Sequence, residues 1–206
     1  MRELPRAARL VIVTVVAAAL GLSIFAAGQI QQWLPILVFA VLYVLADSLP
    51  VGPGTRTAGL TITVTTPVAI AAYIVLGVWG GVLVALASVC DVTRIAPVKR
   101  VFNAGQLVLA VTAGGALYSA LGGTTTLEPG DFPRVLLPAL VSGVVYTFIN
   151  SLLVGVVIAI VENASSIRLL RDILFRTLLP GVAYSALGMV LAVLWTQVGP
   201  LALAFG

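Results

Sequence analysis

Long apolar segments without a single charge, separated by short polar breaks, constrain this chain more than any other feature. The segments at 10–27, 101–121 and 135–161 are of this kind. A helix of about 20 apolar residues crosses the hydrocarbon core of a bilayer. Charged residues make up only 9% of the chain, whereas soluble domains have roughly a quarter. The sequence therefore predicts an all-α, polytopic integral membrane protein that forms one transmembrane helical domain over residues 1–206.

Glycine, proline and polar breaks divide the chain into about seven predicted transmembrane helices. The apolar run at 59–89 is too long for one perpendicular span, and the glycine-rich sequence at 77–81 is a turn signal that divides it into two short helices. Six spans with a re-entrant third segment would preserve the same sidedness. The other predicted spans cover 10–27, 33–49, 101–121, 135–161 and 178–195.

Charge placement predicts the orientation. Lysine and arginine collect in cytoplasmic loops of membrane proteins. With the N-terminus in the cytoplasm, every basic residue except Arg134 falls on the inner side of the seven-span arrangement. We therefore expect a multi-pass protein of the plasma (inner) membrane with a cytoplasmic N-terminus.

Composition argues against catalysis. The chain has no histidine, one cysteine (Cys90) and seven acidic residues, so imidazole proton transfer and a zinc site of histidine and cysteine are excluded. No nucleophile and base pair is recognisable, and we expect a protein that is not an enzyme, with no catalytic residues, metal or cofactor. The net charge of +4 is not a nucleic-acid signal, because such binding needs a basic patch on a soluble surface.

Two polar stripes lie on predicted transmembrane helices. Asn103 and Gln106 are three residues apart and project from one face of the fifth helix, and Ser142, Tyr146 and Asn150 repeat every four residues on the sixth. Such stripes either hydrogen-bond across a helix interface or line a ligand pocket. Under the second interpretation the candidate ligand-binding residues are Asn103, Gln106, Tyr146 and Asn150.

Ionisable residues lie toward the helix ends. Asp47 and Asp91 are both expected near the inner surface, and the lack of a mid-span carboxylate argues against a proton-driven pump. Residues 162–176 combine leucine and isoleucine with basic residues, a pattern typical of an amphipathic cytoplasmic helix on anionic lipid. A helix that docks a partner protein is the alternative. The candidate contact residues are Arg168, Arg171 and Arg176.

Several polar and glycine residues occur in an order that is typical of a known class of membrane domain. Residues 102–107 contain Asn103, Gly105 and Gln106, and residues 115–123, 150–154 and 178–181 continue the pattern. The chain resembles the transmembrane input domain found ahead of HD-type phosphohydrolase and diguanylate cyclase domains in bacteria. The resemblance implies a sensory or anchoring role, with chemistry performed by an attached domain. This sequence has no histidine for an HD motif, and it ends at Gly206. We therefore expect a stand-alone version of the domain, a fragment, or a module that works with separate partners.

Two functions follow as expectations. The first is a non-catalytic, membrane-embedded sensory or anchoring module, which binds a small or lipophilic ligand or relays its state to a cytoplasmic signalling domain. The alternative is a substrate-binding membrane subunit of a transporter, similar to the vitamin-binding components of energy-coupling-factor transporters, which would dock an ATPase module. The bilayer is the common partner, nucleic acid is not expected, and a homo-oligomer remains open.

Overall fold

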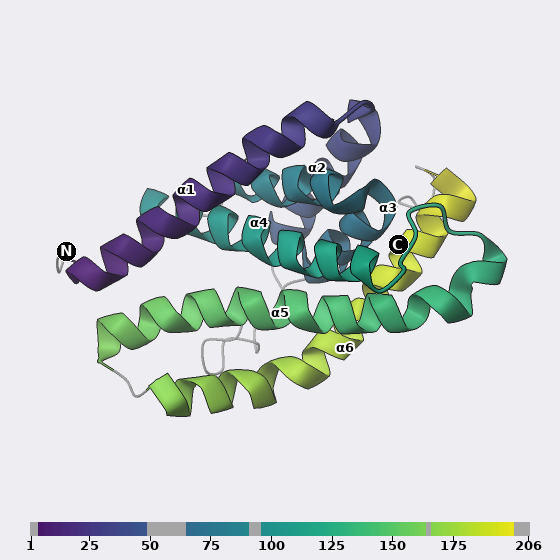
Figure 1. Ribbon diagram of the computed structural model, residues 1–206. Coiled ribbons are helices and arrows are strands. Elements are labelled where there is room, and N and C mark those ends of the chain that lie inside the picture. The colour runs from purple at the N-terminus through teal and green to yellow at the C-terminus, as the bar shows by residue number, and fades with distance from the viewer. Residues whose placement is uncertain (1–3, 49–64, 91–95, 164–165, 200–206) are drawn as a thin grey trace.

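The computed structural model describes residues 4–48, 65–90, 96–163 and 166–199. Within these ranges the chain forms helices and no strand (Figure 1). The helices are α1 (Arg6–Gln29), α2 (Trp33–Ser48), α3 (Thr65–Leu86), α4 (Pro97–Ala120), α5 (Phe132–Glu162) and α6 (Ser166–Val198), with short 3-10 turns η2 (Ala87–Cys90) and η3 (Pro129–Asp131). The predicted all-α fold is therefore correct.

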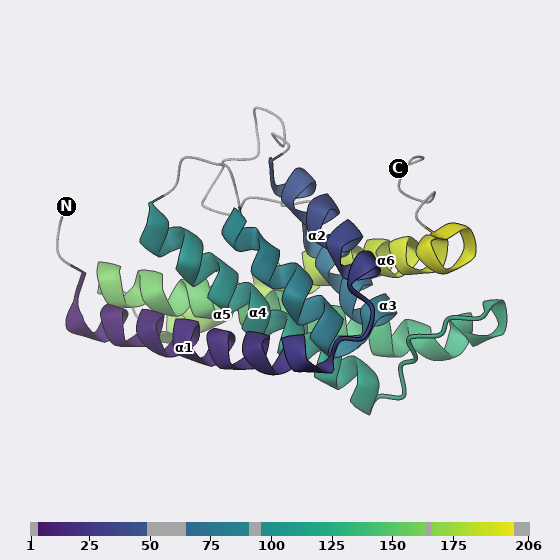
Figure 2. The ribbon, with the colours of Figure 1, turned by 90° about the horizontal axis from the view of Figure 1, so that it is seen from above.

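By length and composition alone, five helical segments could cross a membrane: Arg6–Gln29, Thr65–Cys90, Pro97–Ala120, Pro133–Glu162 and Leu178–Val198. The segment Trp33–Asp47 in α2 is apolar but shorter, and α2 is steeply inclined to α1 when the molecule is seen from above (Figure 2). These lengths are compatible with a multi-pass membrane protein.

The bundle is organised from the centre outward. Side chains of α3 and α4 are mostly buried, whereas α1, α5 and α6 bury only a minor share of theirs. The outward faces carry large apolar side chains, which suit contact with lipid rather than water. Examples are Leu10, Ile24, Leu34, Leu137, Leu179 and Val190.

The chain reverses direction within α3. Gly77 has φ +72° and ψ 176° in an otherwise helical segment, a conformation that essentially only glycine adopts. A Cβ atom on Gly81 would lie 3.0 Å from the Cα of Tyr73, although eight residues of straight helix span about 12 Å. The two arms of α3, 65–76 and 78–86, therefore pack side by side as a helical hairpin.

The turn predicted at 77–81 thus lies at Gly77. Each arm of the hairpin has only about half the length that a perpendicular span needs. The structure does not establish the predicted count of seven spans, because neither described arm reaches across a bilayer alone. Residues 49–64, which include the start of the predicted third span, lie outside the described residues.

Close contacts between small residues hold α3, α4, α5 and α6 together. Gly114 of α4 packs against the backbone of Ser142 and the side chain of Tyr146 on α5. Gly143 of α5 lies against Ser185 of α6, and Gly188 of α6 lies against Ile70 on the first arm of α3. Absence of a side chain at these positions lets the helix backbones approach closely.

Helix α6 corrects one predicted boundary. Residues 162–176 were expected to form a separate cytoplasmic helix, but residues 166–176 are continuous with the last apolar segment in one helix, Ser166–Val198. Pro180 lies inside this helix, near the start of the apolar segment, and here it does not end the helix. Figure 1 shows α6 changing direction part-way along its length.

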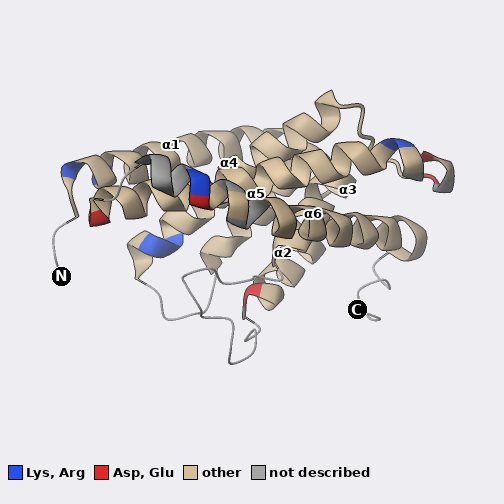
Figure 3. Ribbon diagram, turned by 90° about the horizontal axis from the view of Figure 1, so that it is seen from below, with Lys and Arg blue, Asp and Glu red and all other residues tan. Residues whose placement is uncertain are grey.

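Most basic residues lie in the half of the bundle where α1 begins, and a separate group of charged residues lies at the opposite end (Figure 3). We define the basic end by Arg6, Arg9, Lys99 and Arg100, at the starts of α1 and α4. We define the acidic end by Glu128, Asp131 and Arg134, where α4 connects to α5. This asymmetry comes from the helix directions, because α1, α4 and α6 all begin in the basic half.

Candidate functional site

Buried polar atoms without a partner mark the interior between α4 and α5. The Oε1 atom of Gln106, the hydroxyl of Tyr146 and the Oδ1 atom of Asn150 are buried and have no hydrogen-bond partner among the described residues. In folded proteins the great majority of buried polar atoms are hydrogen-bonded, so each exception needs an explanation. Three of the four candidate residues predicted from the polar stripes are therefore exceptional in the structure.

Tyr146 belongs to a cluster built from three helices. It is 1% exposed and lies beside Tyr43 of α2 and Thr66 at the start of α3. Tyr43 is also 1% exposed and lies beside Thr65. We call Tyr43, Thr65, Thr66 and Tyr146 the tyrosine centre.

The Tyr146 hydroxyl is incompletely satisfied within this centre. The hydroxyl groups of Tyr43 and Thr66 lie within hydrogen-bonding range of it, but neither pair has the distance and angle of a formed hydrogen bond. The carboxylate of Asp47, one helical turn beyond Tyr43 on α2, acts on both tyrosines. The centre thus combines hydroxyl donors, hydroxyl acceptors and one nearby negative charge.

The first arm of α3 begins at this centre and runs to the acidic end. Tyr73 in the middle of the arm shares a hydrogen bond of 3.0 Å with Ser142 of α5, and Gly77 at its far end lies beside Thr125. An arm of this length rises about 18 Å. The start of α3 therefore lies level with the middle of α5, since Tyr146 is near the midpoint of that helix.

Because α3 begins level with the middle of α5, the backbone N–H groups of its first turn lie inside the bundle. The first N–H groups of a helix have no partner within the helix and carry its partial positive charge. Thr65, Thr66 and Pro67 are all buried at this start. The arrangement is that of a half-helix whose N-terminus meets a buried polar cluster.

The amide residues lie on the basic side of the tyrosine centre. Gln106, which is 3% exposed, donates from Nε2 to Asn103 Oδ1 at 2.6 Å. From the level at which Gly114 meets α5, Gln106 lies about 12 Å and Asn150 about 9 Å toward the basic end, since α4 and α5 run antiparallel. Asn150 and Gln106 are therefore at similar levels on adjacent helices.

The structure joins only some of the predicted site residues. Asn103 and Gln106 form a pair, and Asn150 follows Tyr146 by one turn of α5. No hydrogen bond links Asn103 to Asn150 within the described residues, although α4 and α5 are direct neighbours. The polar residues of α4 and those of α5 therefore lie in the same interior without forming hydrogen bonds to each other.

Sequence analysis missed Tyr43, Thr65 and Thr66 as site residues. A signal for the threonines was available, because Thr65, Thr66 and Pro67 form a helix-start pattern in the middle of an apolar run. No comparable signal marks Tyr43, which lies in a helix that is apolar up to Asp47. Its role becomes visible only through the contacts of α2 with α3 and α5.

The predicted lipid or partner contacts lie in the basic half, at the start of α6. Arg171 is exposed there, and Phe175 nearby is 76% exposed, so a basic and an apolar side chain both face outward. The side chains of Arg168 and Arg176 lie outside those described. In the described part of the chain, no group of three histidine, cysteine or acidic residues could hold a metal ion.

Comparison with known proteins adds no constraint to this geometry. No family model, no curated protein and no solved structure matches the chain. The resemblance to bacterial input domains therefore stays a prediction from the residues. Functional conclusions rest on the polar interior itself.

Proposed function

We propose that this chain is a non-catalytic, membrane-embedded module that binds a small ligand at the tyrosine centre and relays its occupancy to a cytoplasmic partner. The observation that carries the proposal is the buried, unpartnered hydroxyl of Tyr146 at the start of the first arm of α3. A polar group buried without a partner costs about 1–3 kcal/mol. A ligand that hydrogen-bonds this hydroxyl recovers that free energy.

The position of the centre suits a ligand that has reached the bilayer interior. Irregular backbone and helix starts at membrane depth occur where protein or a polar cavity surrounds them. Here α2, α3 and α5 surround the centre, and lipid-facing apolar side chains cover the outside of the bundle. Tyrosine hydroxyls and the start of α3 offer donors, while Asn150 offers an acceptor one turn away.

Helix α5 provides the route for a relay. It runs from the acidic end past Tyr146 to Glu162, about 24 Å further toward the basic end. Positive residues favour the cytoplasmic side, so we assign the basic end to the cytoplasm. A ligand that draws Tyr43 and Tyr146 together moves α2 relative to α5 at this point, and we expect the change to reach the cytoplasmic ends of α5 and α6.

A second candidate function is supported by the broken α3. Discontinuous helices with half-helix N-termini near the bilayer midplane form the substrate sites of many transporters. A substrate-binding subunit would use the same tyrosine centre but would need an ATPase-driven partner. Transport that appears only when a partner is present favours the subunit, and a ligand-dependent response of a signalling domain favours the module.

The decisive experiment compares two tyrosines. Tyr146→Phe removes a hydroxyl without a partner, whereas Tyr118→Phe removes one that donates to the carbonyl oxygen of Thr124 at 2.8 Å. We expect Tyr146→Phe to leave the ligand-free protein as stable as before, or more stable, and to abolish retention of the small molecule that co-purifies from native membranes, measured by mass spectrometry. Tyr118→Phe should lose about 1 kcal/mol of stability and retain the molecule.

The opposite pattern would remove the proposal. If Tyr146→Phe lowers the melting temperature as Tyr118→Phe does, the Tyr146 hydroxyl has a structural partner. If Tyr146→Phe retains the co-purified molecule, the ligand does not use this hydroxyl. Both results are read on the full chain, with melting curves to establish that each variant is folded.

A further inference from the structure

A separate cavity opens at the acidic end, far from the tyrosine centre. Its volume is about 270 Å³, slightly below the range of typical small-molecule sites. The walls come from the connection between α4 and α5, the beginning of α5 and the last turns of α6. The lining residues are Leu127, Glu128, Val135, Met189, Val193, Thr196 and Gln197.

The interior of this cavity is apolar and well buried. Val135 and Met189 are each 1% exposed and Leu127 is 8% exposed. The polar lining residues are Glu128, Thr196 and Gln197, of which Glu128 and Gln197 are exposed. The site therefore has an apolar interior and a polar mouth, the combination that binds an amphipathic small molecule.

The wall that carries Glu128 is fixed by hydrogen bonds. The Glu128 N–H donates to Asp131 Oδ2 at 3.2 Å, and the Asp131 N–H donates to the Glu128 carbonyl oxygen at 3.0 Å. Earlier in the connection, Tyr118 donates to the Thr124 carbonyl oxygen at 2.8 Å. The position of the Glu128 backbone is thus set before any ligand arrives, which lowers the entropic cost of binding.

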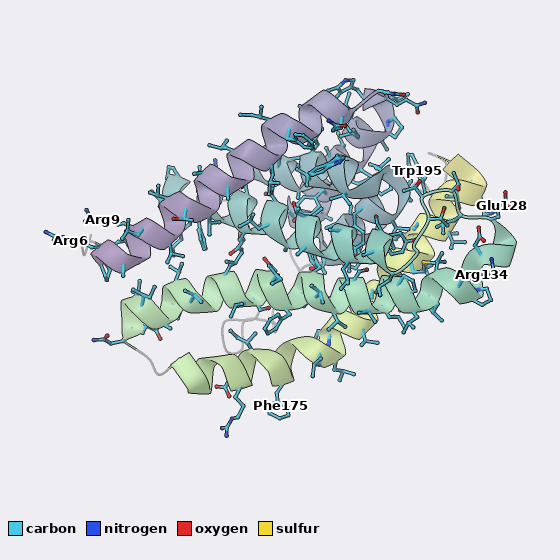
Figure 4. All side chains as sticks on the ribbon, in the orientation of Figure 1. Arg6, Arg9, Glu128, Arg134, Phe175 and Trp195 are labelled. Carbon is cyan, nitrogen blue, oxygen red and sulfur yellow. The ribbon has the colours of Figure 1, made fainter. Side chains whose placement is uncertain are left out.

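Glu128 and Thr196 place acceptors at the mouth of the cavity, beside the Gln197 amide, which can donate or accept. Thr196 donates its hydroxyl proton to the Val193 carbonyl oxygen at 2.9 Å, so its oxygen can only accept from a ligand. Arg134 lies at the same end of the molecule (Figure 4), but within the described residues no ion pair neutralises Glu128. The cavity therefore offers a negative charge and a hydroxyl acceptor beside an apolar pocket.

We propose that this cavity binds a small organic cation, with its ammonium group at Glu128 and a short apolar body against Val135 and Met189. Charge complementarity selects the cation, because an anion of the same shape would meet Glu128 and a neutral molecule would leave it unpaired. The ammonium group can belong to a free amine or to an aminated lipid headgroup. This site does not depend on the tyrosine centre, so failure of one proposal leaves the other standing.

The test uses three probes with one apolar body. Butylammonium, butanol and butanoate are titrated against the full chain in phosphatidylcholine nanodiscs, with binding followed by saturation-transfer NMR and calorimetry. We expect butylammonium to bind at least fivefold more tightly than butanol, and butanoate not to bind. Glu128→Gln should reduce butylammonium affinity to that of butanol, a loss of about fivefold or more.

Two control variants separate charge from shape. Glu162→Gln removes an exposed acid at the basic end and should leave all three affinities unchanged. Val135→Trp places a much larger side chain in the apolar interior and should weaken binding of butylammonium and butanol together. Melting curves of the variants establish that the fold is intact.

Equal binding of the three probes, or unchanged butylammonium binding to Glu128→Gln, would overturn the proposal. The source of the ammonium group is identified by replacing part of the lipid with phosphatidylethanolamine. Competition that rises with the phosphatidylethanolamine content supports a lipid headgroup. Unaltered butylammonium binding in the same nanodiscs supports a free amine.

Discussion

Substitution of Gly77 by alanine tests the reversal of α3. The residue has φ +72° and ψ 176°, and an L-residue held in this region costs about 1–3 kcal/mol. A Cβ atom there would approach only Thr125 Cγ2, at 3.8 Å, which is an ordinary contact. The penalty is therefore backbone strain alone, and Gly77→Ala should lower the free energy of unfolding by about 1–3 kcal/mol.

The assay is equilibrium unfolding in mixed micelles, with Gly21→Ala as the control. Gly21 lies inside α1 and has no atom within 4 Å of the added Cβ, so alanine there should be neutral or slightly stabilising. A loss at Gly77 no larger than at Gly21 would contradict the reversal.

Labelling of single cysteines by a thiol reagent is a second test of the turn at Gly77. Val78→Cys and Thr125→Cys, each in a Cys90→Ala background, should react with an impermeant thiol reagent from the same side, because Gly77 lies beside Thr125. Val78→Cys in a continuous transmembrane α3 would sit in the bilayer interior and stay unlabelled. If Thr125→Cys reacts with the reagent and Val78→Cys does not, the hairpin is refuted.

Four further substitutions test the packing and the amide residues. Gly81→Ala places a Cβ 2.8 Å from the Cβ of Tyr73, and overpacking of this kind should cost about 1–3 kcal/mol in the same unfolding assay. Gly188→Ala places one 2.6 Å from Ile70 Cγ2 and 3.0 Å from the Pro67 carbonyl oxygen, so a similar loss is expected, and a neutral result would show that α6 does not press on the first arm of α3. Asn103→Leu removes the acceptor of Gln106 Nε2 and should cost about 1 kcal/mol, whereas Asn150→Leu removes an unpartnered atom and should not destabilise the ligand-free protein; equal losses would contradict this difference.

Periodicity and composition predict most of this fold because lipid restricts the choices. A chain with long uncharged segments must satisfy its backbone internally, and helices do so within each segment. The breaks at 28–32 and 121–131 were therefore readable, and so was the turn at 77–81, because glycine is needed there. The continuity of α6 could not be predicted, because the change from mixed basic and apolar residues at 162–176 to an apolar segment does not tell whether one helix continues through both.

The site was only half predictable for a related reason. Tyr146 and Asn150 repeat on one face of an apolar helix, so a sequence pattern singles them out. Tyr43 and Thr66 become site residues through the reversal at Gly77, which brings the start of α3 beside α2 and α5. Such contacts between distant segments depend on helix packing, which hydropathy does not encode.

The first arm of α3 runs from one proposed site to the other. Its start lies in the tyrosine centre, and its end at Gly77 contacts Thr125, in the connection whose later residues Leu127 and Glu128 line the outer cavity. A packed helical arm transmits displacement because its neighbours leave no free volume. If a ligand at one site moves the arm, linkage requires that a ligand at the other changes the first affinity by the same factor. Titration of butylammonium with and without the co-purified molecule therefore measures one coupling factor in both directions, and Gly77→Ala should alter it while leaving the side chains of both sites in place.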